Sequence, residues 1–345
     1  MAGAGTNRQW LFRHPPEGPH DTAAFEWSEG TIPSPADGEA LVRNLWLSFD
    51  PTQILVLAAP PGAGGVPVGA AVRGLAVSQV LASRHPSFQE GDLVHGYSGW
   101  EDYSVIDGHG YFETTKVPAG VPPDLALGAL GVTGMAAYFG MTEIGRPTAG
   151  ETAVVSAAAG GVGSVAVQIA RLRGARTIGI AGGPAKKEWL VREARVDGAI
   201  DHRSEDVGAR LDALCPEGID VFFDNAGGPI LDEALVRLRR NGRIVVCGGT
   251  SRYAARPEPS GPRNYLALSL VNGRMEGLLA RDYAPRFPEA VAALRAWIAS
   301  GQLRIKEDVV VGLENAPSAL ARLFDGSNVG KQLVKIADAP PPVPG

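Results

Sequence analysis

The chain has 345 residues, of which 45% are hydrophobic and 20% are charged, and its formal net charge is −5. This length predicts two domains with sizeable cores, and the acidic balance with scattered basic residues argues against nucleic acid as a partner. The first residues lack the apolar core of a signal peptide, and no later run is long enough to span a membrane. We therefore expect a cytoplasmic protein without membrane contact.

Metal binding is not expected. The two cysteines, Cys215 and Cys247, have no metal-ligand spacing with any of the six histidines. A catalytic zinc site built from Cys and His would need ligands in the N-terminal third, where His85 and His95 occur but no cysteine does.

The N-terminal part, up to about residue 122, consists of short apolar runs that are broken by Pro and Gly, such as residues 39–48, 75–81 and 91–96. This spacing predicts a β-rich, barrel-like domain. Residues 125–141 have a helical pattern and lead directly into the next strand. We place the domain boundary near Val121.

A glycine turn organises the middle of the chain. The apolar residues 153–156 lead into Gly160, Gly161, Val162 and Gly163, and a helical apolar pattern and a second β-run at 177–180 follow. This is a βαβ unit, in which small residues let backbone N–H groups approach a pyrophosphate at the helix N-terminus. A glycine triplet alone also occurs in ordinary α/β turns, but the flanking strand and helix favour dinucleotide binding.

The end of the second strand indicates which dinucleotide binds. An NAD site places Asp or Glu there to hold the ribose hydroxyls, whereas this chain has only small residues, followed by Lys186 and Lys187. The absence of an acid and the presence of two cations favour NADP(H). The alternative is that the lysines form a solvated first helical turn, where cations oppose the helix dipole.

The following segments alternate between helices and strands. We predict helices from residues 185 and 204 and at 231–238 and 287–298, and strands at 198–201, 220–224, 243–247 and 274–279. The C-terminal remainder returns to β-runs around a helix at 314–324. The predicted fold class is α/β, with a doubly wound parallel sheet domain at 122–300 inserted into the β-rich domain at 1–121 and 301–345.

Several separated motifs together resemble one family. They lie at residues 45–51, 131–138, 156–163, 223–228, 242–248, 264–266, 274–277 and 328–331. In these segments the chain resembles the zinc-independent prostaglandin reductase and alkenal/enone oxidoreductase family of the medium-chain dehydrogenase/reductase superfamily. The resemblance is nearly full-length. It implies a Rossmann domain inserted into a GroES-like catalytic domain, NADPH-dependent reduction of the carbon–carbon double bond of a small α,β-unsaturated carbonyl compound, and a homodimer.

The resemblance also implies positions for the cofactor. Gly160 to Gly163 would hold the pyrophosphate and Lys186 the ribose phosphate, with His202 where the family has a tyrosine and Arg203 beside it. Asn328 would contact the carboxamide. The residues that would line the ribose and nicotinamide side are Asn225, Cys247, Gly248, Thr250, Ser251, Tyr253 and Leu278.

The predicted substrate pocket departs from the family at Thr52, where many members have a tyrosine. Tyr97 and Trp100 are candidate pocket walls, although core packing explains both aromatic residues equally well. Reduction of a conjugated double bond needs a donor for the developing enolate oxygen. The candidates are the ribose hydroxyl, Tyr253, which we prefer, and Thr52, with water as the final proton source.

Two other functions fit the same sequence. One is a reductase of quinones or other conjugated carbonyls in the same superfamily. The other is a low-turnover NADPH-binding sensor or scaffold, because a fold does not fix a function.

Overall fold

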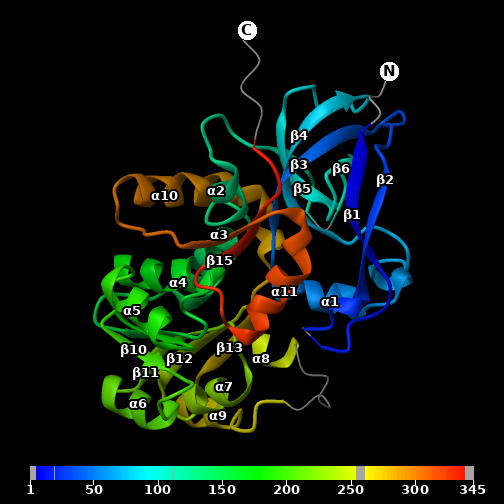
Figure 1. The fold of residues 1–345 in the computed structure, drawn as a ribbon. Coiled ribbons are helices and arrows are strands. Elements are labelled where there is room, and N and C mark those ends of the chain that lie inside the picture. Colours follow the sequence, from blue (N-terminus) through cyan, green and yellow to red (C-terminus); the bar gives the residue numbers. More distant parts are fainter. Residues whose placement is uncertain (1–4, 19, 111, 254–260, 339–345) are drawn as a thin grey trace. The chain divides into compact units, whose positions relative to one another are not determined.

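The computed structural model describes residues 5–18, 20–110, 112–253 and 261–338 (Figure 1). Its contacts divide the chain into two compact units. The β-rich unit comprises residues 1–127, 308–327 and 332–345, and the cofactor unit comprises residues 128–307 and 328–331. These divisions lie six and seven residues beyond the domain limits predicted from sequence, at 121 and 300. The domain limits themselves stay a prediction, because contacts define compact units and not independently folding domains.

The β-rich unit is built on antiparallel sheets. In its described residues, the larger sheet has the order β14-β15-β3-β4-β5-β7, with β6 paired to β3, and β1 pairs with β2. The strands are β1 (Thr6–Phe12), β2 (Phe25–Thr31), β3 (Ala40–Ser48), β4 (Arg73–Ser83), β5 (Leu93–Gly99), β6 (Tyr103–Ile106), β7 (Thr115–Lys116), β14 (Glu307–Val311) and β15 (Lys331–Lys335). The helices are α1 (Gln53–Ala58), α2 (Pro123–Leu127) and α11 (Ala316–Asp325), with 3-10 turns at Thr22–Ala24, Pro61–Ala63 and Leu313–Asn315.

The cofactor unit contains a six-stranded parallel sheet in the order β10-β9-β8-β11-β12-β13. Its strands are β8 (Thr152–Val155), β9 (Arg176–Ala181), β10 (Gly198–Asp201), β11 (Ile219–Asp224), β12 (Leu238–Val246) and β13 (Arg274–Gly277). The helices are α3 (Val132–Phe139), α4 (Gly161–Leu172), α5 (Pro184–Arg192), α6 (Val207–Leu214), α7 (Gly228–Leu235), α8 (Thr250–Tyr253), α9 (Ala267–Val271) and α10 (Phe287–Ala299). A π-helical turn follows α3 at Gly140–Gly145, and a 3-10 helix at Ala280–Arg286 precedes α10.

The central strands β8 and β11 are buried along their whole length because helices cover both faces of the sheet. On one face, Val154, Ile178 and Phe222 form a core cluster with residues of α6 and α7, such as Leu211 and Leu235. The intervening strand residues face the opposite side, where α4 contacts β8 and β9 and also packs against α3. The α/β fold predicted from sequence, with its parallel sheet and separate β-rich part, is therefore confirmed.

Several predicted helix boundaries differ from the structure, and two of the differences have a clear cause. The single helix predicted at 125–141 is interrupted between α2 and α3, where Gly131 takes an extended conformation with φ −96° and ψ −161°. The helix predicted at 231–238 ends at Leu235, and Leu238 already pairs with Ile219 as the first residue of β12. Short apolar runs do not distinguish helix from strand, which explains the second difference.

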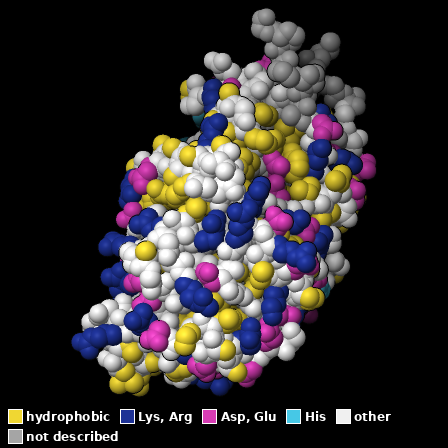
Figure 2. All heavy atoms as spheres, turned by 90° about the vertical axis from the view of Figure 1, so that its left-hand side faces the viewer, with side chains coloured by type: hydrophobic (Ala, Val, Ile, Leu, Met, Phe, Trp, Pro, Cys, Tyr) yellow, Lys and Arg dark blue, Asp and Glu magenta, His cyan; other side chains and the backbone are white. Residues whose placement is uncertain are grey.

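Charged side chains of both signs are interspersed over the face shown in Figure 2. This distribution agrees with the scattered basic residues of the sequence. Among the described residues, no helix combines the length and the apolar character that a membrane crossing requires.

Candidate cofactor and active site

The turn between β8 and α4 is tightly packed. Gly160 is the N-cap of α4, and a Cβ atom on Gly163 would lie 2.3 Å from the Ala157 carbonyl oxygen and 2.8 Å from Ala158 Cα. Ala157 has a φ of 46°, in the left-handed region that costs a residue with a side chain roughly 1–2 kcal/mol. The first N–H groups of an α-helix have no partner inside it. The turn thus presents donors for an anion at the carboxyl end of the sheet.

The strand order reverses between β8 and β11, because β9 lies on one side of β8 and β11 on the other. Ligands of open α/β sheets bind outside the carboxyl ends of the strands at such a point. Here the Ser156 hydroxyl donates to Asp224 Oδ1 at 2.9 Å and accepts the Asn225 N–H at 2.8 Å. The Asn225 side chain donates to the Ser156 carbonyl at 2.8 Å. Burial raises the pKa of Asp224. These bonds hold the loops after β8 and β11 together.

The corner after β9 and β10 collects basic side chains. A Cβ atom on Gly182 would lie 2.9 Å from both His202 Nε2 and Arg203 Nε. The pKa of His202 is lowered, first by burial and then by the charges of Arg203 and Lys186, so Lys186 belongs to the same corner. Lys187 is instead held by Glu205 at 2.6 Å.

Asp201, the last residue of β10, is held by groups of the adjoining loops. The Asp201 carboxylate accepts the Gly183 N–H at 2.7 Å and the Ser204 hydroxyl at 2.8 Å. The Gly183 N–H is the main cause of the lowered pKa of Asp201. The carboxylate thus shapes the loop around the basic side chains.

The loop after β12 carries Tyr253, the preferred donor. The N–H groups of Cys247 and Gly248 donate to the Asp224 carbonyl at 2.9 and 3.1 Å, which fixes the start of the loop. The Tyr253 hydroxyl oxygen accepts the Gly249 N–H at 3.0 Å, and burial raises the pKa of Tyr253. The phenol therefore stays protonated, and its hydroxyl can still donate a hydrogen bond. Burial also raises the pKa of Cys247 to about 12, so its thiol stays neutral.

The other predicted residues near this loop form hydrogen bonds mainly through their backbone N–H groups. Thr250 donates its N–H to the Asn225 carbonyl at 3.0 Å, and Ser251 donates both its N–H and its hydroxyl to the Ala226 carbonyl, at 3.1 and 2.6 Å. Leu278 donates its N–H to Val246 at the end of β12. These contacts join the loops at the carboxyl ends of β11, β12 and β13.

A C-terminal segment, residues 328–331, also belongs to the cofactor unit. Gly330 forms a parallel bridge with Gly160 and donates its N–H to the Ala159 carbonyl at 2.8 Å. Asn328 is 6% exposed, and its side-chain amide donates to the Gly330 carbonyl at 3.0 Å. This segment brings Asn328 to the glycine turn from a distant part of the sequence.

The three predicted substrate residues belong to the β-rich unit. Thr52 is exposed at the start of α1, and its side chain does not cap the helix. Tyr97 is half-buried. Trp100 has no exposed surface and packs between Phe25 and Phe49, with ring centroids 5.5 and 5.0 Å away. Its environment supports the core-packing alternative over a role as a pocket wall.

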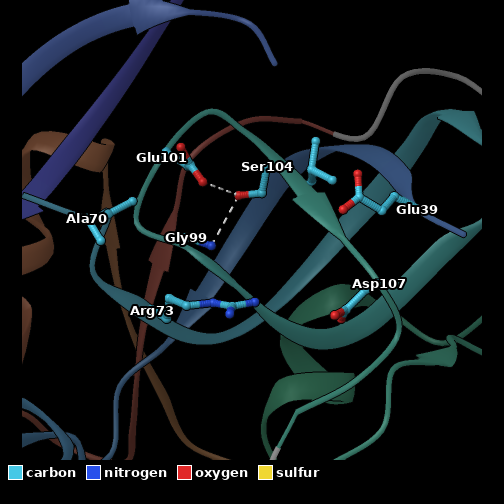
Figure 3. A pocket seen from close by; sticks show the side chains of 9 residues that line it. Glu39, Ala70, Arg73, Gly99, Glu101, Ser104 and Asp107 are labelled. Atoms are coloured by element: carbon cyan, nitrogen blue, oxygen red, sulfur yellow. Dashed lines mark hydrogen bonds between the residues drawn. The ribbon is translucent and has the colours of Figure 1, made fainter. Parts of the chain in front are cut away.

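A cavity of about 270 Å³ lies elsewhere in the β-rich unit (Figure 3). Its lining includes Arg73 and the carboxylates of Glu39, Glu101 and Asp107. Ser104 donates to Glu101 at 2.6 Å. No predicted site residue lines this cavity, and its charged walls differ from the apolar lining of most small-molecule sites.

Sequence reasoning missed two features of the cofactor unit. The first is the Ser156–Asp224 bond, which the positions of both residues at the carboxyl ends of strands could have indicated. The second is the burial of Lys331 beside the glycine turn, for which the sequence contains no local signal. The strand order of the sheet, the glycine turn before α4 and the basic corner after β9 together define a protein that binds a phosphorylated dinucleotide.

Comparisons with known proteins agree with this class. Residues 8–114 match a family model described as the N-terminal domain of oxidoreductase, and residues 161–296 match one described as zinc-binding dehydrogenase. Although the second description names zinc, no group of His, Cys, Asp or Glu side chains that could hold a metal ion occurs in the described part of the chain.

The chain is 36% identical to the NADPH-dependent curcumin reductase of Escherichia coli over 96% of this chain and 97% of that protein. It is 38% identical to the 2-alkenal reductase (NADP(+)-dependent) of Nicotiana tabacum over 87% of this chain and 88% of that protein. The crystal structure of CurA from Vibrio vulnificus in complex with NADPH superimposes with a TM-score of 0.89 at 37% identity, covering 96% of this chain and 99% of that one. The chain therefore belongs to the NADP-dependent reductases of the medium-chain dehydrogenase/reductase superfamily. The predicted family and the predicted preference for NADP(H) are confirmed.

Proposed function

We propose that this chain uses NADPH to reduce the carbon–carbon double bond of α,β-unsaturated carbonyl compounds, with hydride transfer to the β-carbon. The observation that carries the proposal is the Tyr253 hydroxyl, which lies at the end of α8, after β12, and accepts the Gly249 N–H at 3.0 Å. Support also comes from the relatives, whose names specify curcumin and 2-alkenals, both of which are conjugated carbonyl compounds.

The residues present fit the cofactor. The glycine turn leaves room for a pyrophosphate at Gly160, where a Cβ atom would have a single close neighbour, the Ala157 oxygen at 3.3 Å. Lys186, His202 and Arg203 surround the corner after β9, where the adenosine ribose of a dinucleotide lies, and would hold its 2′-phosphate. When bound, NADPH supplies the hydride.

The chain's own contribution is stabilisation of developing charge. As hydride adds to the β-carbon, an electron pair moves onto the carbonyl oxygen, which becomes an enolate oxygen. The Tyr253 hydroxyl accepts from Gly249 at 3.0 Å and so has its proton free to donate to that oxygen. Water then protonates the α-carbon, so one hydride and one proton add across the double bond. Thr52 is the alternative donor, since its exposed hydroxyl does not cap α1.

The first experiment measures NADPH oxidation with enones, enals, quinones and nitroalkenes, and identifies the products. NADPH deuterated at the transferable position should place deuterium on the β-carbon, while reaction in D₂O should label the α-carbon. Reduction of the carbonyl group itself, or turnover of quinones alone, would select the quinone reductase alternative. Tight NADPH binding without turnover of any compound would select the sensor.

The second experiment separates the two candidate donors. Tyr253→Phe should lower the rate of enone reduction by up to about a hundredfold, and by less where the ribose hydroxyl shares the charge. Thr52→Val should have a smaller effect, and NADPH affinity is measured separately for both variants. If Thr52→Val loses the rate while Tyr253→Phe keeps it, Thr52 is the donor.

We further propose that the protein is a homodimer joined through the β13 edge. In the described residues, β13 pairs only with β12, and all four of its residues are exposed. Large exposed apolar side chains occur in and before this strand, namely Tyr265, Leu266, Leu270 and Met275. Pairing two such edges across a two-fold axis would cover them.

A further inference from the structure

Asp201 lies where the two loops of the basic corner meet. It is the last residue of β10, and only 6% of its surface is exposed. One oxygen of its carboxylate, Oδ1, accepts the Gly183 N–H at 2.7 Å and the Arg203 N–H at 3.1 Å. The first N–H belongs to the loop after β9 and the second to the loop after β10. A single side-chain oxygen therefore joins the two loops.

Each of these loops carries basic side chains of the corner. Gly183 is the N-cap of α5, so its position determines where the first turn of α5 begins, and Lys186 lies in that turn. On the other loop, His202 Nε2 and Arg203 Nε would both lie 2.9 Å from a Cβ atom on Gly182. The bonds to Asp201 thus fix the spacing between the lysine on one loop and the histidine and arginine on the other.

The Asp201 carboxylate is itself held in place. The Ser204 hydroxyl donates to its second oxygen, Oδ2, at 2.8 Å, and the Asp201 N–H donates to Glu205 Oε2 at 2.8 Å. The negative charge of this carboxylate works against the binding of a phosphate nearby, since like charges repel. A local cost of this kind is expected where the residue has a compensating role. Here that role is the acceptor geometry, which a neutral amide oxygen would also provide.

We propose that Asp201 is a positioning residue for recognition of the 2′-phosphate, which holds the loops after β9 and β10 so that their basic side chains converge on one phosphate group. The inference rests on the cofactor site proposed above. It adds that the preference for NADPH over NADH depends on a residue that acts through its hydrogen bonds to the two loops.

The test is calorimetric binding of NADPH and NADH to Asp201→Ala and Asp201→Asn. Asp201→Ala removes the shared acceptor. NADPH binding should therefore weaken about tenfold or more, the size of one lost charge-assisted contact, while NADH binding should change by less than about threefold. In Asp201→Asn the amide oxygen can still accept both N–H groups, and the Ser204 hydroxyl can turn to accept from the amide nitrogen. This variant should keep the wild-type preference for NADPH.

Asp197→Ala is the matched control for stability. Asp197 immediately precedes β10 at its other end and accepts the Thr177 N–H of β9 at 2.7 Å. Its replacement removes a bond between the same two strands, away from the basic corner. Asp197→Ala should therefore lower the melting temperature, as Asp201→Ala does, but leave the ratio of the two cofactor affinities at its wild-type value.

Asp201→Glu separates charge from position, because it keeps the carboxylate and displaces it by one methylene group. It should lose the preference for NADPH as Asp201→Ala does, and it replaces that variant if Asp201→Ala does not fold. An unchanged preference in Asp201→Ala or Asp201→Glu, or a lost preference in Asp201→Asn, would overturn the assignment. A wild-type protein that binds both cofactors equally would instead refute the 2′-phosphate site itself.

Discussion

Replacement of Gly163 by alanine should damage both the stability and the cofactor affinity of the protein. The added Cβ would lie 2.3 Å from the Ala157 oxygen and 2.8 Å from Ala158 Cα, whereas nonbonded carbon atoms prefer about 3.5–4.0 Å. Both neighbours are backbone atoms, so the turn or the start of α4 must move by roughly 1 Å to relieve the contact. Overpacking of this kind costs about 1–3 kcal/mol.

Such a shift also displaces the N–H groups that face the pyrophosphate. We expect an apparent melting temperature lower by roughly 2–4 °C for each kcal/mol lost, and NADPH binding at least about tenfold weaker. Thermal unfolding of the cofactor-free protein and calorimetric titration with NADPH measure the two effects separately.

Gly160→Ala is the matched control for stability. Its Cβ would have a single close neighbour, the Ala157 oxygen at 3.3 Å, and its φ of −89° is open to alanine. The cofactor-free Gly160→Ala protein should therefore unfold within about 0.5 kcal/mol of wild type. If Gly163→Ala is equally stable and binds NADPH normally, the turn is not closely packed and the argument fails.

Three further predictions follow from the charges and the exposed edge. Lys186→Ala should weaken NADPH binding about ten- to a hundredfold and leave NADH binding nearly unchanged. Lys187→Ala should alter neither affinity, because Lys187 is held by Glu205. Equal losses for the two cofactors in Lys186→Ala would contradict the assignment. Burial and nearby cations lower the pKa of His202, and a bound phosphate would raise it. As pH falls and His202 becomes protonated, the NADPH affinity of the wild type should therefore increase relative to that of His202→Gln. Parallel pH profiles of the two proteins would show that His202 does not touch the phosphate. Light scattering should find a wild-type dimer that Leu270→Glu dissociates and Val191→Glu on α5 does not, and a wild-type monomer at micromolar concentration would refute the interface.

The glycine turn was predictable because its determinants are local. The strand, the three glycines and the following helix are consecutive in sequence, and each constrains the next. The same holds for the absence of an acid after the second strand. Asp201 follows the third strand instead, and its carboxylate binds the Gly183 N–H and the Ser204 hydroxyl. Sequence alone could not show that the Asp201 carboxylate would accept hydrogen bonds from the loop.

Features that depend on distant packing were not predictable. Trp100 lies in an alternating β-run where an aromatic residue serves equally well as core or as pocket wall, and only its position between Phe25 and Phe49 distinguishes the two. The burial of Lys331 depends on contacts with residues about 170 positions earlier, at Gly160 and Gly161. No periodicity or propensity reports such a contact.

The placement of the basic residues explains how an acidic protein can bind a highly anionic cofactor. The net charge of −5 repels such a ligand at long range, so attraction must come from charges close to each phosphate. Arg203 is exposed, and salt should screen its charge. The pyrophosphate would instead face the N–H groups of the glycine turn, which carry only partial charges. Added salt should therefore reduce the preference for NADPH over NADH more than it reduces the binding that the two cofactors share.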